Sequence, residues 1–224
     1  MKESGICRRH RTPAYLARAC TQVHFLIKRF RRSGSIIMAT DARTSAISST
    51  GPEKLGYAEY CMLPADDKRH EIIDGEHVVT PAPSTTHQTV SKRLLYELYT
   101  QLELTDRGLV FAAPVDVQLT EHDIVQPDLV VILKDRADIV TESKIAGVPD
   151  LVIEILSPSS RTQDRQVKLR AYERTGVAEY WLADPDSRTL ERYRLRDGRY
   201  QREPAADPVE AFGGGLSIRL DDIW

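Results

Sequence analysis

A carboxylate stands in the middle of an aliphatic run that has the character of a strand buried on both faces. In the segment GVPDLVIEILSPSS, residues 147–160, Glu154 is flanked by Val, Ile and Leu. Burial of an ionised carboxylate costs several kcal/mol unless the group is paired, protonated or bound to a cation. Glu154 therefore needs a partner from elsewhere in the chain.

Asp128 is the candidate partner, because it stands where a Pro-Asp step enters a second aliphatic run, VQPDLVVIL. If the two runs are neighbouring strands, the carboxylates lie roughly 5 Å apart and can bracket a hard divalent cation such as Mg²⁺ or Mn²⁺. Asp150 is the rival, but it lies on the Glu154 strand about 13 Å away, and we expect it to open that strand. A protonated or salt-bridged core pair is the alternative interpretation.

The helix expected after the Glu154 strand supplies a cation. Asp164, Lys168 and Tyr172 fall at i, i+4 and i+8 and so share one helix face. The SPSS loop is short, so the Lys168 ammonium can reach the two carboxylates, polarise a phosphodiester and stabilise charge on its oxygens. A weak surface ion pair between Asp164 and Lys168 is the alternative.

The preceding part of the chain carries patterns for a hairpin, a helix and a strand. HEIIDGEHVVT predicts two strands that turn at Asp74-Gly75. Residues 84–104 predict an amphipathic helix with Ser84 as a candidate cap and apolar residues at four-residue spacing. YAEYCMLP predicts a short helix ended by Pro64, and residues 109–120, LVFAAPVDVQLT, alternate as one half-buried strand would.

The following part predicts a second helix and more strands. Residues 159–176 predict a helix closed by Gly176. AEYWLAD, TLERYRL and GRYQRE predict strands separated by turns at Asp184-Pro185 and Asp197-Gly198. This order of elements predicts an α/β fold with a central mixed β-sheet flanked by helices.

Composition indicates one ordinary domain with a distinct leader. The 224 residues are 41% hydrophobic and 29% charged, which is typical of a globular protein and leaves no apolar run long enough for a membrane span. Cys7, Cys20 and Cys61 are far apart and suggest neither a disulfide framework nor a zinc site, so we expect a cytoplasmic protein.

The N-terminal leader differs in charge from the rest of the chain. Residues 1–37 hold nine Lys and Arg against one Glu, while the remainder holds 22 basic and 32 acidic residues. We expect residues 1–56, the leader and a Ser/Thr-rich arm, to be disordered. Residues 1–37 are read as an upstream extension that precedes a start at Met38; a nucleic-acid arm and a targeting tail are the alternatives.

Together, the segments from about Tyr57 to the C-terminus resemble the Uma-two-type endonuclease family, a branch of the PD-(D/E)XK restriction-endonuclease-like superfamily. The resemblance rests on VQPDLVVI, GVPDLVIEILSPSSRTQDRQVKLRAYERTGVAEYWLADP and the hairpin segment. It implies a restriction-endonuclease-like core over residues 57–224, with Asp128 and Glu154 as the metal-binding pair.

One departure from the superfamily pattern concerns the lysine. The usual third motif is Glu-x-Lys, but this chain has Glu154-Ile155-Leu156. Lys168 is the natural substitute, displaced onto the following helix. Weaker candidates for lining the cleft are Glu71, Glu76, His87, Gln126 and Asp164; for the first three, a solvated hairpin or cap role is the alternative.

These residues and the resemblance together predict a metal-dependent endonuclease, with Asp128, Glu154 and Lys168 as its catalytic residues. DNA is the expected substrate, with RNA as the alternative. A catalytically inactive nuclease-fold module that binds or acts as a scaffold is the alternative from a different class. A nuclease domain that acts only with a mobile-element or defence partner is a third hypothesis. The sequence leaves a homodimer open.

Overall fold

A six-stranded mixed sheet forms the centre of the fold in the computed structural model, which describes residues 54–64, 66, 68–204 and 206–224. Its strand order is β11-β10-β9-β8-β6-β3. Strands β8 and β9 run parallel, and every other neighbouring pair is antiparallel. The strands are β3 (Gly108–Ala112), β6 (Leu129–Leu133), β8 (Leu151–Ile155), β9 (Glu179–Asp184), β10 (Thr189–Arg196) and β11 (Arg199–Arg202). The predicted mixed α/β architecture is confirmed.

The pairing of β6 with β8 brings the two Pro-Asp segments together. Leu129 pairs with Ile153 in an antiparallel ladder, so the next position of that ladder sets Asp128 opposite Glu154. Side chains alternate between the two faces of a strand, and Glu154 shares its face with Val152. The expectation that these two runs are neighbouring strands is therefore confirmed.

One face of the central sheet packs against helix α2 (Thr85–Leu98), which continues as the π-helical turn η3 (Tyr99–Glu103). Ser84 caps the helix by accepting a hydrogen bond from the His87 backbone N–H at 3.2 Å. The predicted apolar stripe, Val90, Leu94, Leu98 and Leu102, is buried against the odd-numbered strand residues, such as Leu129 and Ile153.

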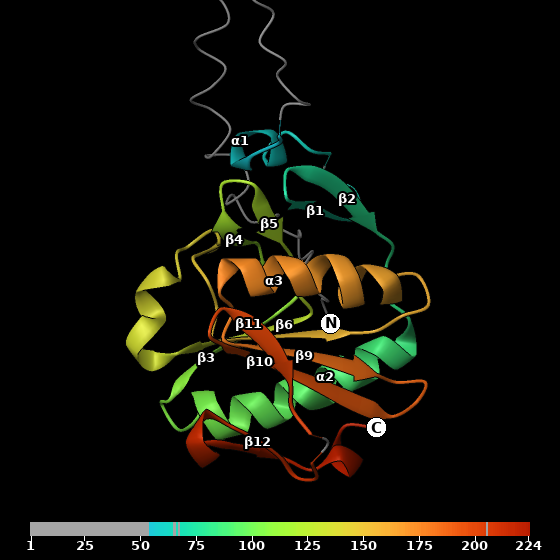
Figure 1. Ribbon diagram of the computed structural model, residues 1–224, viewed down its shortest axis with the longest axis vertical. Coiled ribbons are helices and arrows are strands. Elements are labelled where there is room, and N and C mark those ends of the chain that lie inside the picture. The colour runs from blue at the N-terminus through green and yellow to red at the C-terminus, as the bar shows by residue number, and fades with distance from the viewer. Residues whose placement is uncertain (1–53, 65, 67, 205) are drawn as a thin grey trace, which may run out of the picture. The chain divides into compact units, whose positions relative to one another are not determined.

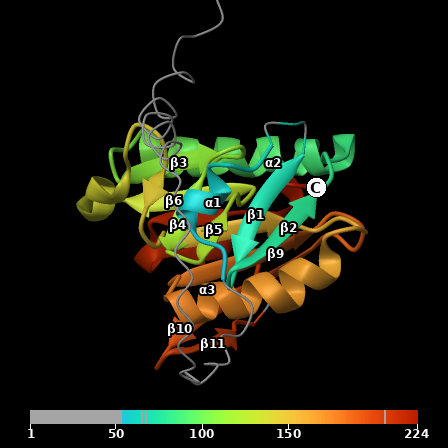
Figure 2. The same ribbon diagram turned by 90° about the horizontal axis from the view of Figure 1, so that it is seen from above.

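The opposite face packs against the second predicted helix, as Figures 1 and 2 show. This helix comprises the π-helical segment η5 (Gln163–Lys168) and α3 (Leu169–Thr175). Gly176 ends it with φ of 91°, the left-handed conformation that glycine adopts without strain. Tyr172 packs there with Val130 and Val152.

A second sheet, in the order β2-β1-β5-β4-β7, packs with the α3 face of the central sheet. Its strands are β1 (Arg69–Ile73), β2 (Glu76–Thr80), β4 (Val117–Thr120), β5 (Asp123–Val125) and β7 (Ile145–Ala146). Asp74 and Gly75 form the predicted β1–β2 turn and both have positive φ, as a two-residue hairpin of this kind requires. The predicted hairpin is confirmed.

The single strand expected over residues 109–120 is wrong. The segment is divided between β3 in the central sheet and β4 in the second sheet, with a bend at Ala113-Pro114. Pro114 has no N–H with which to continue a strand ladder. The apolar alternation runs through the bend, so it gave no sign of the change of sheet.

Several short elements complete the described structure. Helix α1 (Tyr57–Tyr60) ends before Pro64, as expected. The hairpin of β12 (Val209–Ala211) and β13 (Leu216–Ile218), which the sequence patterns did not predict, packs into the same core as α2. The remaining turns are the 3-10 helices η4 (Lys134–Ile139), η6 (Phe212–Gly214) and η7 (Leu220–Asp222).

All described residues fall within one unit of the chain, Thr50–Trp224. The expectation of a disordered leader and arm concerns residues 1–56, of which 1–53 lie outside the described residues. None of the helices in the described part has both the length and the apolar character needed to cross a membrane.

Candidate active site

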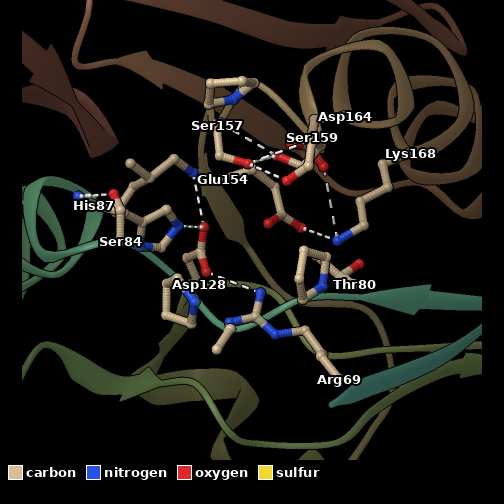
Figure 3. Close-up of a pocket in the computed structure, with 16 residues that line it drawn as sticks. Arg69, Thr80, Ser84, His87, Asp128, Glu154, Ser157, Ser159, Asp164 and Lys168 are labelled. Atoms are coloured by element: carbon tan, nitrogen blue, oxygen red, sulfur yellow. Dashed lines mark hydrogen bonds and ion pairs between the residues drawn. The ribbon is translucent and has the colours of Figure 1, made fainter.

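A cavity of about 160 Å³ opens where β6 begins and β8 ends. Two loops form its walls: residues 80–84, which lead into α2, and residues 157–160, which connect β8 to the second helix. The charged and titratable side chains that line it are Arg69, His87, Asp128, Glu154, Asp164 and Lys168 (Figure 3). Six charged or titratable side chains from five parts of the chain thus meet in one small space, with Asp164 and Lys168 both on η5.

Asp128 is held by donors on both of its oxygens. Oδ1 accepts from Arg69 Nη1 at 2.9 Å, and Oδ2 accepts from the Ile155 backbone N–H at 2.8 Å. His87 Nε2 lies 2.9 Å from Oδ2, and because an ionised carboxylate only accepts, Nε2 carries the proton.

The same donors keep Asp128 ionised. Burial alone would raise the pKa of Asp128, but the hydrogen bond from His87 and the positive charge of Arg69 outweigh burial and lower the pKa to about 2. Asp128 therefore carries a negative charge at neutral pH.

Glu154 points to the α3 side of the sheet and is 2% exposed. Its Oε1 accepts hydrogen bonds from Lys168 Nζ and from the Tyr172 hydroxyl, each at 2.9 Å. Burial raises the pKa of Glu154 to about 8; the charge of Lys168 opposes this rise and that of Asp164 adds to it. The site therefore favours a positive charge, from a proton or a cation, next to Glu154.

Lys168 is surrounded by carboxylates. Its Nζ lies 2.9 Å from Glu154 Oε1, 3.0 Å from Glu71 Oε1 and 3.8 Å from Asp164 Oδ1. Burial alone would lower the pKa of Lys168, but these three carboxylates raise it above its ordinary value. The ammonium is therefore charged. The alternative of a weak surface ion pair between Asp164 and Lys168 does not apply, since both side chains are only 3% exposed.

The structure brings together most of the residues singled out from the sequence. Asp128, Glu154, Lys168, His87 and Asp164 all line the cavity. The aspartate judged to open the Glu154 strand, Asp150, lies at the other end of β8, where it accepts from Arg136 and from the Leu133 backbone N–H.

Glu71 does not line the cavity but contacts Lys168, which does. The solvated hairpin role considered for it is wrong, because Glu71 is fully buried. Its Oε1 contacts Lys168 and accepts from the Gln126 backbone N–H at 2.8 Å, and its Oε2 is buried without a hydrogen-bond partner in the described part of the chain.

Glu76 and Gln126 are not part of the cavity. Glu76 is exposed beside the β1–β2 turn. The Gln126 side chain donates to Asp116 at 2.7 Å and to the Tyr60 hydroxyl at 3.1 Å, and it lines an adjoining cavity.

Sequence reasoning missed Arg69, although it holds Asp128 directly. Arg69 and Glu71 are two apart on β1 and so share a strand face, which places both beside the site. Because Glu71 was already a candidate, the strand alternation that places Arg69 on the same face was the signal that could have identified Arg69. The contact itself joins residues 59 apart in the chain and depends on how the second sheet packs.

The donor set fits a hard divalent cation. Glu71, Asp128, Glu154 and Asp164 carry four negative charges when ionised, and Arg69 and Lys168 carry two positive charges, which leaves an excess of two. The buried, unpartnered Glu71 Oε2 adds unused acceptor capacity. No group of three His, Cys, Asp or Glu side chains in residues 54–224, where described, is arranged to hold a metal, so an ion here would use two carboxylates together with water and substrate oxygens, as Mg²⁺ commonly does.

Comparisons with known proteins agree with this fold. The chain is similar to the "Uncharacterized protein slr1290" of Synechocystis sp., with 27% identity over 180 residues that cover 76% of this chain and 92% of that protein. Its fold is similar to the crystal structure of "a putative nuclease belonging to DUF820" from Anabaena variabilis, with a TM-score of 0.62 and 24% identity over 75% of this chain and 97% of that chain.

The family comparison covers nearly all of the described structure. The family model Uma2, described as "Putative restriction endonuclease", matches residues 57–220. The match supports a nuclease-like function and therefore a nucleic-acid substrate. The chain belongs to the Uma2 family, consistent with a restriction-endonuclease-like core.

Proposed function

We propose that this protein is a metal-dependent endonuclease that hydrolyses phosphodiester bonds in DNA, with Asp128 and Glu154 as ligands of Mg²⁺ or Mn²⁺. The observation that carries the proposal is that these two carboxylates come from adjacent strands and line one cavity beside a charged lysine. The activity is assigned to residues 57–224.

We assign a separate role to each residue of the site. A divalent ion held by Asp128 and Glu154 would supply Lewis-acid stabilisation of the charge that develops on the phosphodiester oxygens. His87 and the Ile155 N–H fix the orientation of Asp128 through Oδ2. Lys168 holds Glu154 in place and contributes positive charge to the site.

The proposal is tested by incubating the full chain with plasmid and oligonucleotide DNA in Mg²⁺, Mn²⁺ or EDTA. We expect cleavage only with metal and a loss of at least about a hundredfold in both Asp128→Asn and Glu154→Gln, since removal of one strong transition-state contact commonly costs that much. Asp150→Asn is the matched control, because Asp150 also follows a proline and opens a buried strand but lies away from the cavity. Cleavage that persists in both site variants contradicts the assignment.

A catalytically inactive binding or scaffold module is the second candidate. It is favoured by the observation that Asp128 and Glu154 already have cationic partners, Arg69 and Lys168, as a purely structural polar network would. This candidate predicts DNA binding without cleavage and no heat of Mg²⁺ or Mn²⁺ binding by calorimetry at neutral pH.

A further inference from the structure

Arg69 differs from Lys168, the other cation of the site, in how many of its N–H groups are available to donate to a ligand. In the described residues its guanidinium makes one hydrogen bond, from Nη1 to Asp128 Oδ1. A guanidinium has five N–H donors in a rigid plane. None of its nitrogen atoms is buried without a partner, and the side chain is 17% exposed. The remaining donors are therefore accessible from the cavity, and Figure 3 shows the guanidinium beside Asp128.

Lys168 is not available in this way. Its three donors face three carboxylates, and its side chain is only 3% exposed. To bind a substrate phosphate, the ammonium would have to leave Glu154 or Glu71 and expose buried negative charges to one another. That exchange is costly, so the first positive charge a phosphate meets in this cavity is that of Arg69.

Arg69 also stands between two cavities. A second cavity of about 320 Å³ adjoins the first and shares Arg69, His87 and Asp128 with it. Its further lining includes Lys68, Gln88 and Ser91. A backbone that passes from one cavity to the other would bring a phosphate to the guanidinium at their boundary.

We propose that Arg69 is a phosphate-binding residue that receives the nucleic-acid backbone at the boundary of the two cavities, with Asp128 holding one edge of its guanidinium in place. The inference rests on the proposed function and assigns the substrate contact to Arg69 rather than to Lys168. The planar fork of arginine suits this task, because two parallel N–H groups can donate to two phosphate oxygens. A guanidinium already oriented by a buried carboxylate loses little freedom on binding.

The experiment measures binding without catalysis. The full chain is titrated into a fluorescently labelled single-stranded oligonucleotide and into its duplex, in EDTA and over a range of salt concentrations, and anisotropy is recorded. We expect Arg69→Gln to weaken binding about tenfold. We also expect the slope of log affinity against log salt to fall by about 0.7 for the single strand or about 0.9 for the duplex, because one phosphate contact is lost.

Arg69→Lys separates phosphate binding from a structural role. The lysine retains the charge, so the salt slope should match that of wild type, while the affinity should fall because the ammonium lacks the planar fork. If Arg69 served folding alone, its replacement would lower the thermal unfolding midpoint. A changed salt slope with an unchanged midpoint therefore indicates a lost phosphate contact.

Arg136→Gln is the matched control. Arg136 donates to Asp150 at 2.9 Å, the same distance as in the Arg69–Asp128 pair, and Asp150 likewise follows a proline. Neither Arg136 nor Asp150 lines either cavity. This variant removes one arginine and one ion pair of the same kind, and its affinity and salt slope should equal those of wild type.

Three outcomes overturn the inference. If Arg69→Gln keeps the affinity and salt slope of wild type, and the wild-type protein cleaves DNA with Mg²⁺, the role of Arg69 is overturned and the proposed function stands. An equal loss in Arg136→Gln shows a general charge effect and also overturns it. A wild-type protein that neither binds nor cleaves any of the oligonucleotides overturns both proposals.

Discussion

The ammonium of Lys168 lies 2.9 Å from Glu154 Oε1, so a helix that follows β8 supplies the cation beside that strand's carboxylate. The position two residues after Glu154, where a lysine is usual in the superfamily, holds Leu156, which is 3% exposed and packs in the apolar core. Lys168 thus supplies, from the helix, the positive charge that the apolar Leu156 cannot supply from the strand. Tyr172, one turn further on, donates to the same oxygen.

We expect Lys168→Met to lower the free energy of unfolding by about 3–5 kcal/mol, because it leaves the buried carboxylates of Glu71 and Glu154 without their shared cation. Urea unfolding followed by circular dichroism measures the change. The matched control is Lys134→Met, which removes an ion pair with Asp106 in which both side chains are more than half exposed, and which should cost less than about 1 kcal/mol. Equal losses in the two variants contradict the buried-charge argument.

The Lys168→Met variant should recover stability when a carboxylate is also removed. Glu154→Gln combined with Lys168→Met also removes the buried carboxyl group that has lost its cation, and the double variant should be more stable than Lys168→Met alone. Additive losses would show that the two side chains do not interact.

A second prediction concerns acid stability and the buried carboxylate of Asp123, which does not line the cavity. Asp123 accepts from Arg174 at 2.9 Å and 3.1 Å and from the Asp74 backbone N–H at 2.9 Å. Burial alone would raise the pKa of Asp123, but these hydrogen bonds and that from Thr120 outweigh burial and lower the pKa below its usual value.

Because the folded-state pKa of Asp123 is the lower one, the folded protein binds its proton less readily than the unfolded chain. The stabilisation is therefore fully present above the unfolded pKa of about 3.9 and is lost as pH falls through the folded pKa. Asp123→Asn should be less stable than wild type at pH 6, and the difference should shrink below about pH 4 in urea titrations. Asp221→Asn, which changes an 84% exposed side chain, should match wild type throughout; a constant deficit in Asp123→Asn would refute the linkage.

A third prediction joins a helix cap to the site. Ser84 Oγ accepts from the His87 backbone N–H at the start of α2, and His87 in turn donates to Asp128. Ser84→Ala should cost about 1 kcal/mol of stability and, by loosening the first turn, lower metal-dependent cleavage. Ser84→Asp keeps an acceptor at this position and should restore the stability. Stability lost without any change in cleavage would separate the cap from the site.

The core of the site could be predicted from the sequence because Glu154 stands within an aliphatic run, and Asp128 at the start of another, that are typical of buried strands. Asp128 and Glu154 each needed a partner on chemical grounds, and the helical spacing of Lys168 after a short loop pointed it toward them. Such signals are local, or connect two adjacent strands. The pairing of Asp128 with Glu154 then follows from the register of one ladder.

The remaining features depend on how distant segments pack. Arg69 reaches Asp128 only because the second sheet places β1 beside the first residues of β6. The burial of Glu71 has the same origin, and nothing in its neighbourhood along the chain distinguishes it from an exposed hairpin residue. The three-residue strands β12 and β13 are too short to show a period.

The last prediction concerns metal binding measured without catalysis. An ion that binds the folded protein alone stabilises it by RT ln(1 + [L]/Kd), about 2.7 kcal/mol at a hundredfold excess over Kd, which raises the thermal midpoint of a domain of this size by several degrees. We expect Mg²⁺ or Mn²⁺ to produce this shift in wild type and in Asp150→Asn, and to produce none in Asp128→Asn or Glu154→Gln. Because each variant is compared with itself in EDTA, differences in intrinsic stability do not enter. A shift of wild-type size in both site variants would place the ion elsewhere on the protein and remove the metal from the proposed mechanism.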